Sequence, residues 1–401
     1  MKKYVFLVTA LSVLLISCSG RSKRAVEIKG NGIYAIDPNS ATVLESNIYK
    51  SIKTIILETS EACLIGSINS MRVYDQHIYI LDRTIAKSLY VFDMEGRFVR
   101  QIGGVGQGPG EYLQPFDFTI DKDNNTVYIL DGRSQRINKY DLASGRFLHA
   151  INPDRNVRSD QIEYVEGKLY ADAHFYNHSD DNYLLRVINE STGVEESRYL
   201  NVMEYYKGIS NNATQIFSVK AFYVQENGNA VFVQPYMDHV IQITRDSIYS
   251  LIEIKSKDVL TPEEIKKVME KGFASFMGLF RIDKYQQIQN FFEHDNRIFF
   301  SCYKNGLRTF LFNKQTNELN IIRKRSESLL FKENKQNLLF SITFRCQDAN
   351  GVYYSTSSDA MLLLIEAAKA GDLSPDLDSL EDLKNLEEDA NPVLFYYEFK
   401  D

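Results

Sequence analysis

The chain has 401 residues and a formal net charge of −7, from 46 Lys and Arg against 53 Asp and Glu. An apolar fraction of 44% is enough to build a core, which excludes a disordered chain. The acidic balance argues against a nucleic-acid-binding protein, because such a protein uses Lys and Arg to replace phosphate counterions. Aromatic residues make up 12% of the chain although Trp is absent, and this Tyr- and Phe-rich profile favours strands over helices.

The N-terminus has the pattern of an export signal. Lys2 and Lys3 precede an apolar run of about 13 residues, which is shorter than the roughly 20 that a spanning helix needs. The sequence Leu-Ile-Ser-Cys that ends at Cys18 resembles the lipobox of bacterial lipoproteins, which implies that Cys18 becomes the acylated N-terminus. We therefore predict a signal peptide over residues 1–17 and a lipid-anchored tether over residues 18–42. An ordinary secretory signal is the alternative.

The residue after Cys18 is Ser19 and not Asp, which by resemblance to lipoprotein sorting indicates the outer membrane. Acylated Cys18 would attach the protein to the bilayer, and the sequence leaves open whether the body faces the periplasm or the outside. The other cysteines are Cys63, Cys302 and Cys346, an odd number for an oxidising compartment. Buried free thiols and a Cys302–Cys346 disulfide both remain open.

A repeat of short strands runs through the rest of the chain. Its clearest copies are residues 77–102 and 126–151, which share an apolar strand ending in Asp, a polar turn and a Gly-Arg-Phe turn. Weaker copies continue to the C-terminus. The equivalent anchor positions are Tyr79, Tyr128, Tyr170, Phe232, Phe299 and Tyr353. Their spacings of 49, 42, 62, 67 and 54 residues match four-stranded propeller blades with loop insertions.

These repeats predict an all-β fold over residues 43–401, a six-bladed β-propeller with short helical insertions. The segment Ile52–Leu57 should complete the last blade beside the C-terminal strand, because an unclosed ring would leave open edges. An open pair of sheets is the alternative. One helix should begin at the capping box Thr261–Glu264 and another should span Met361–Ala370. The leucines at 377, 380, 383 and 386 predict a buried stripe.

The segments SIKTIILET at Ser51–Thr59 and IGGVGQGPGEY at Ile102–Tyr112 resemble bacterial six-bladed β-propeller lipoproteins related to NHL-repeat propellers. The resemblance implies a fold and a compartment, and it implies no activity. The glycine-rich loop lacks the Lys-Ser/Thr of a phosphate-binding loop, and Pro109 removes an N–H group. We expect a structural turn between two blades, with Glu111 and Tyr112 as candidate ligand-binding residues.

Further candidates lie at strand ends and in one histidine cluster. Asp82, Arg83, Asp131 and Arg133 follow equivalent strands, where the carboxylates either accept hydrogen bonds from turn amides or line a central channel. His174 and His178 have a spacing that suits a divalent metal when the segment is helical. Here they lie in a strand-to-loop segment, so we expect no cofactor and keep a metal as the alternative.

Taken together, the sequence predicts an envelope lipoprotein whose propeller is a ligand- or protein-binding scaffold. Its partner would be a protein or a carbohydrate, since aromatic rims can pack on either. The sequence favours a non-enzymatic role, and the alternative is a metal-dependent lactonase-type hydrolase with its site in the central channel. No residue is assigned a catalytic role.

Overall fold

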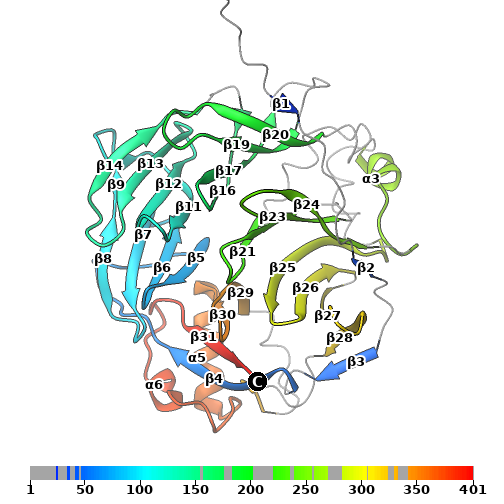
Figure 1. The fold of residues 1–401 in the computed structure, drawn as a ribbon. Coiled ribbons are helices and arrows are strands. Elements are labelled where there is room, and N and C mark those ends of the chain that lie inside the picture. Colours follow the sequence, from blue (N-terminus) through cyan, green and yellow to red (C-terminus); the bar gives the residue numbers. More distant parts are fainter. Residues whose placement is uncertain are drawn as a thin grey trace, which may run out of the picture.

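The structure is a computed structural model, and it describes residues 24–25, 34–36, 41–44, 47–153, 157–175, 183–201, 220–234, 239–254, 257–269, 282–304, 306–323, 329–332 and 342–400. Cys18 and the predicted signal peptide lie outside these ranges. Within them the strands form six small antiparallel sheets arranged in a ring (Figure 1). The predicted all-β, six-bladed propeller is therefore confirmed.

Each blade has four strands that run outward from the axis, which we call A to D. Blade 1 contains β5 (Ser70–Tyr74), β6 (His77–Asp82), β7 (Ser88–Asp93) and β8 (Phe98–Ile102). Blade 2 contains β11 (Pro115–Asp121), β12 (Thr126–Asp131), β13 (Arg136–Asp141) and β14 (Phe147–Ile151). Blade 3 contains β16 (Ile162–Val165), β17 (Lys168–Asp172), β19 (Tyr183–Ile188) and β20 (Glu195–Asn201).

The other three blades follow the same order. Blade 4 contains β21 (Phe222–Val224), β22 (Ala230–Phe232), β23 (His239–Ile243) and β24 (Ile248–Ile254). Blade 5 contains β25 (Gln286–His294), β26 (Arg297–Tyr303), β27 (Leu307–Asn313) and β28 (Glu318–Arg323). Blade 6 contains β29 (Ile342–Gln347), β30 (Gly351–Thr356), β31 (Leu394–Phe399) and β4 (Tyr49–Ile55).

Burial explains why these sequences form blades. Every residue of β12 is buried, because the second strand of a blade has a neighbouring blade on both faces. The outer strand β8 alternates between half-buried and exposed positions before its buried last residue, as a rim strand does. The core lies between blades: Tyr79 and Val91 of blade 1 pack in one cluster with Phe118 and Ile129 of blade 2.

The N-terminal segment closes the ring and continues around it. The strand β4 pairs antiparallel with β31, so the chain start completes the last blade as the sequence predicts. Three earlier strands, β1 (Arg24–Ala25), β2 (Tyr34–Ile36) and β3 (Ala41–Leu44), pair in parallel with the outer strands of blades 3, 4 and 5. Part of the segment predicted as a tether thus runs along the outside of the ring.

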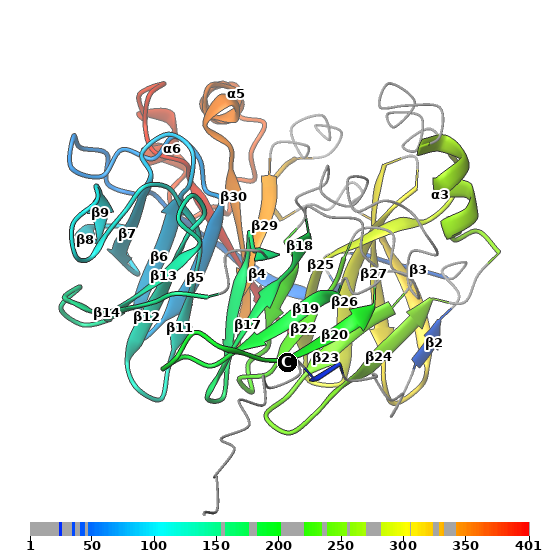
Figure 2. The ribbon, with the colours of Figure 1, turned by 90° about the horizontal axis from the view of Figure 1, so that it is seen from above.

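Helical insertions lie on one face of the propeller, as Figure 2 shows. Helix α3 (Pro262–Met269) begins with the predicted capping box, in which Thr261 and Glu264 exchange backbone-to-side-chain hydrogen bonds. The 3₁₀ turn η4 (Ser358–Ala360), helix α5 (Met361–Ala370) and helix α6 (Leu380–Lys384) lie between β30 and β31. The predicted leucine stripe packs inward, with Leu383 fully buried.

The antiparallel order gives the propeller two distinct faces. The A–B and C–D turns lie on one face, which we call the turn face. The B–C connections and the D–A loops between blades lie on the other, which we call the loop face and which carries α3, α5 and α6. Cys63, Cys302 and Cys346 are free thiols, so the Cys302–Cys346 disulfide is not formed. None of the described helices is long and apolar enough to cross a membrane.

Candidate functional site

The aspartates at the strand ends stabilise the loop face. Asp82, which is fully buried, ends β6 and accepts hydrogen bonds from four backbone N–H groups. The donors are Gly66, Ser67, Thr84 and Ile85, at 2.8 to 3.1 Å. In the same way, Asp131 accepts the N–H groups of Leu113 and Gln114 in the preceding D–A loop. Asp172 accepts those of Asp160 and Gln161 in the next such loop. Backbone donors lower the pKa of Asp131 against the opposing effect of burial.

The glycine-rich loop folds onto itself. Its two ends form the short parallel strands β9 (Gly104–Val105) and β10 (Glu111–Tyr112). The Glu111 carboxylate accepts the Gly108 N–H at 2.7 Å, and a side chain at Gly106 would meet that carboxylate. Tyr112 is fully buried and donates to the Ile102 carbonyl at 3.3 Å, and burial raises its pKa. The loop is the structural connection between blades 1 and 2 that the sequence predicts.

The two candidate arginines also lie in B–C connections. The Arg83 guanidinium carbon lies 3.6 Å from the ring centroid of Phe116, and Arg158 lies 5.2 Å from the same ring. This stacking is a cation–π arrangement. The side chain of Arg133 is exposed, while its N–H donates to Asp131. Asp82, Arg83, Asp131, Arg133, Glu111 and Tyr112 therefore share the loop face.

The histidine hypothesis is not tested. His178 lies outside the described residues, and of His174 only the backbone is described, in the short strand β18 (His174–Phe175) that pairs with β15 (Val157–Arg158). Elsewhere, the described part of the chain contains no group of three or more His, Cys, Asp and Glu side chains placed to hold a metal ion.

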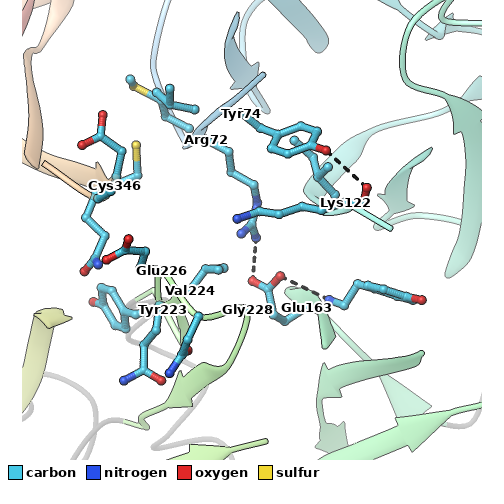
Figure 3. A pocket seen from close by; sticks show the side chains of 18 of the residues that line it. Arg72, Tyr74, Lys122, Glu163, Tyr223, Val224, Glu226, Gly228 and Cys346 are labelled. Atoms are coloured by element: carbon cyan, nitrogen blue, oxygen red, sulfur yellow. Dashed lines mark hydrogen bonds and ion pairs between the residues drawn. The ribbon is translucent and has the colours of Figure 1, made fainter. Parts of the chain in front are cut away.

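A cavity of about 470 Å³ occupies the central channel toward the turn face (Figure 3). All six blades contribute to its wall, mainly through their A strands and A–B turns. Apolar and aromatic side chains make up much of this wall: Met71, Ile120, Tyr223, Phe291 and Phe344. None of the six candidates of the loop face lines it, because they lie at the other ends of the strands.

A buried ion pair joins blades 1 and 3 along the inner strand of blade 2. Arg72 donates to Glu163 at 2.8 Å, and Figure 3 shows this contact in the cavity wall. Arg72 also donates to the Phe118 carbonyl at 3.1 Å, and the second carboxylate oxygen of Glu163 accepts the Thr119 hydroxyl at 2.5 Å. Glu163 is 1% exposed, and both of its carboxylate oxygens accept hydrogen bonds from protein donors, as buried polar atoms usually do. The pair is a fixed part of the wall.

Two lysines add further positive charge. Lys220 precedes β21, and its ammonium donates to the Arg345 carbonyl at 2.8 Å. Burial, followed by the nearby charge of Arg72, lowers the pKa of Lys220 to about 8. Lys122, in the A–B turn of blade 2, points toward Arg72 in Figure 3, and the same two causes lower its pKa. Arg72 and Lys220 thus place two cationic groups on the inner wall of the channel.

Burial also shifts the pKa values of two other groups near the ion pair. Burial raises the pKa of the Asp117 carboxyl to about 6, although Arg72 opposes the shift. Burial also raises the pKa of the Cys346 thiol to about 12, so it is not a thiolate nucleophile at neutral pH. At the mouth, Asp123, Glu166 and Glu226 are exposed carboxylates of three A–B turns.

The sequence analysis did not single out the residues of the cavity wall, although some of them lie at a fixed position in the repeat. In four blades the A-strand residue that pairs with the anchor lies seven positions before it, as the register of the A–B hairpins shows. These residues are Arg72, Glu163, Phe292 and Cys346, opposite Tyr79, Tyr170, Phe299 and Tyr353. Three of them line the cavity. Counting back from each anchor would have found them.

Comparison with known proteins finds a matching family and solved structures of similar fold. A family model described as "Domain of unknown function (DUF4934)" matches residues 33–398. Among solved structures, the chain is similar to a protein of Bacteroides fragilis NCTC 9343 described as a "Putative exported protein". The TM-score is 0.70 at 17% identity, over 92% of this chain and 100% of that one.

A second similar structure is a member of the DUF4221 family from Bacteroides vulgatus ATCC 8482. Its TM-score is 0.52 at 11% identity, over 88% of this chain and 97% of that one. At these identities both likenesses concern the fold alone, and the relation to NHL-repeat propellers stays a prediction. One curated relative, protein translocase subunit SecA of Mycoplasmopsis pulmonis, is 19% identical over 288 residues. The match covers 65% of this chain and 31% of the length of SecA.

Proposed function

We propose that this chain, which belongs to the DUF4934 family, is an envelope lipoprotein whose propeller binds a small molecule in the central cavity. The observation that carries the proposal is the cavity itself, to which every blade contributes. Its volume of about 470 Å³ is within the roughly 300–1,000 Å³ range of small-molecule sites. Apolar walls with a few convergent polar groups are also typical of such sites.

The envelope location rests on the predicted signal peptide and on Cys18, and the likeness to a protein described as exported supports it. Acylation of Cys18 would leave the propeller attached to the outer membrane through the segment before β1. A Cys18→Ser variant is expected to move from the membrane fraction to the soluble fraction of the envelope. Retention of the variant in the membrane would contradict the lipid anchor.

A binding role is favoured over the hydrolase alternative. Lactonase-type catalysis requires a channel metal held by carboxylate and amide side chains, and the carboxylate of Glu163 is already bound by Arg72 and Thr119. The other channel-lining groups fit recognition: fixed charge, lysine donors and aromatic faces. A protein partner on the loop face, or a carbohydrate in the cavity, stays compatible with this role.

The test is a thermal-shift screen of the purified chain with sugars, sugar acids, amino acids, nucleosides and short peptides. We expect at least one class of compound to raise Tm in a concentration-dependent way, because a ligand that binds only the folded state stabilises it. The matched variants are Val224→Trp, which fills the cavity, and Val105→Trp, which adds the same side chain to an exposed position of the loop face.

Val224→Trp should abolish the Tm shift, and Val105→Trp should preserve it. The Tm of each variant without ligand shows whether the propeller still folds. No shift with any compound, or a shift that survives in Val224→Trp but not in Val105→Trp, would contradict binding in the cavity.

A further inference from the structure

The charged groups of the cavity wall differ in their positions along the channel. The Arg72 charge is neutralised by Glu163, whose two oxygens are both occupied. Within the described part of the chain, neither Lys122 nor Lys220 forms an ion pair with a carboxylate. An ammonium group has three donors, and among the described residues the acceptor that Lys220 contacts is the Arg345 carbonyl. The charges of Glu163 and Asp117 act on Lys220 through space, but no described carboxylate contacts its ammonium, which leaves donors of this cation free.

Lys220 lies at the inner end of the cavity. It precedes β21, whereas Glu226 lies in the turn that follows this strand at the mouth. The two residues are six positions apart, which at about 3.3 Å per residue of extended chain separates their Cα atoms by up to roughly 20 Å. The cation Lys220 thus lies at the inner end, whereas the mouth carries the three exposed carboxylates together with Lys122.

For an anionic ligand, the attraction of Lys220 exceeds the repulsion by the carboxylates of the mouth. The carboxylates of the mouth are exposed, and salt screens such groups over about 8–10 Å. Lys220 is partly buried, where the effective dielectric constant is lower and each contact is stronger. A single acidic group can pass the mouth and gain more at Lys220 than it loses there, whereas a polyanion would keep several charges beside Glu226 and its neighbours.

We propose that the ligand is a small monocarboxylate whose other end carries hydroxyl groups, of the sugar-acid class, with its carboxylate on Lys220. This deepens the proposed function and rests on it. The ligand carboxylate places a negative charge in direct contact with Lys220 and accepts hydrogen bonds from its free donors. The hydroxyl groups donate to the carboxylates of the mouth, and the ring packs on the aromatic faces of Tyr223 and Phe344, which line the wall between them.

Phosphate is the other anion that a lysine could bind, and the structure favours carboxylate. The planar guanidinium fork, which suits bidentate phosphate binding, is already occupied at Arg72 by Glu163. A phosphomonoester also carries nearly two charges at neutral pH, so the negative mouth disfavours it about twice as strongly. Glucose 6-phosphate and glucuronate therefore distinguish the two chemistries.

The experiment is calorimetric titration of the full chain with D-glucuronate, D-glucose and D-glucose 6-phosphate. Glucuronate and glucose share one ring and differ only in the carboxylate. We expect glucuronate to bind at least roughly tenfold more tightly than either of the others. Lys220→Met should remove this preference, Lys220→Arg should retain most of it, and Lys53→Met, on the exposed outer strand of blade 6, should not change it.

The pH profile separates a direct contact from a structural effect of the substitution. Because the Lys220 ammonium loses its proton near pH 8, glucuronate affinity should fall up to tenfold per pH unit above that value. The affinity for glucose, and the affinity of Lys220→Arg for glucuronate, should not change with pH over this range.

Three outcomes would overturn the inference: equal binding of glucose, tighter binding of glucose 6-phosphate, or an unchanged preference in Lys220→Met. Each of them would still leave a bound ligand, and so the proposed function, in place. Absence of any binding by the three sugars would overturn the inference as well, and the library screen with its Val224→Trp variant then decides the proposed function separately.

Discussion

The two faces of the propeller use charged residues in opposite ways. On the loop face, Asp82, Asp131 and Asp172 occupy equivalent strand ends, and each accepts backbone N–H groups of an adjoining loop. Toward the turn face, equivalent positions carry different residues, and Lys220 has one carbonyl as its partner. Residues that repeat from blade to blade hold the ring together, whereas residues that break the repeat form the cavity. This contrast predicts that substitution of a repeated loop-face residue destabilises the ring, whereas substitution of Lys220 in the cavity does not.

The largest effect is expected at the loop face. Asp82→Ala removes the acceptor of four backbone N–H groups and should lower the free energy of unfolding by about 3–4 kcal/mol. The matched control is Asp123→Ala at the exposed mouth of the cavity, where the change should stay within about 0.5 kcal/mol. Urea denaturation of both variants measures the difference. Equal losses would show that the two ends do not differ as described.

The ion pair across the channel should give the next largest effect. Glu163→Gln leaves the buried Arg72 charge without its partner, which should cost about 3 kcal/mol of stability. The double variant with Arg72→Met should recover most of the loss, because both charges are then gone. The same Glu163→Gln substitution should tighten glucuronate binding, since the channel becomes more positive. A double variant as unstable as the single one would indicate lost packing rather than an unpaired charge.

The buried carboxyl of Asp117 should make the stability of the cavity end depend on pH. Its folded pKa of about 6 lies above the ordinary value of 3.8, so the folded state binds the extra proton between these values. Its contribution to stability is therefore present below about pH 4 and is lost as pH rises through 6. Asp117→Asn keeps an acceptor for the Ile162 N–H and removes this dependence. Relative to the wild type, the variant should gain about 2–3 kcal/mol on going from pH 4 to pH 7. A difference that does not change with pH would contradict the buried neutral carboxyl.

The smallest effect distinguishes function from stability. Lys220→Met replaces a partly buried cation with an apolar chain of similar length and should stabilise the fold by about 1 kcal/mol. The control Lys53→Met should change stability by less than about 0.5 kcal/mol. Thermal denaturation at neutral pH compares the two. A clear loss of stability in Lys220→Met would mean that Lys220 holds the blades together.

Much of the fold could be predicted from the sequence because its determinants are local and repeated. The strand ending at Asp82 and the one ending at Asp131 carry the same pattern of burial and turn residues, and closure by the segment at Ile52 follows from the need to cover an edge. The site could not be predicted in the same way. Arg72 lies at a fixed position of the repeat, but its residue type does not repeat, and Lys220 precedes its strand. Both reach the cavity only because the ring brings blades 1 and 4 to one axis. The conspicuous glycine-rich loop, in contrast, drew attention to the face that serves the fold.

The most direct test of a ligand site at the inner end of the cavity is the acetylation rate of each lysine in the native protein near pH 8, measured by peptide mass spectrometry. At this pH a substantial fraction of Lys220 is an uncharged amine. D-glucuronate should slow the acetylation of Lys220 and leave Lys53 unchanged, and D-glucose should protect neither. An unchanged rate at Lys220 in saturating glucuronate, or protection confined to lysines of the loop face, would contradict the site.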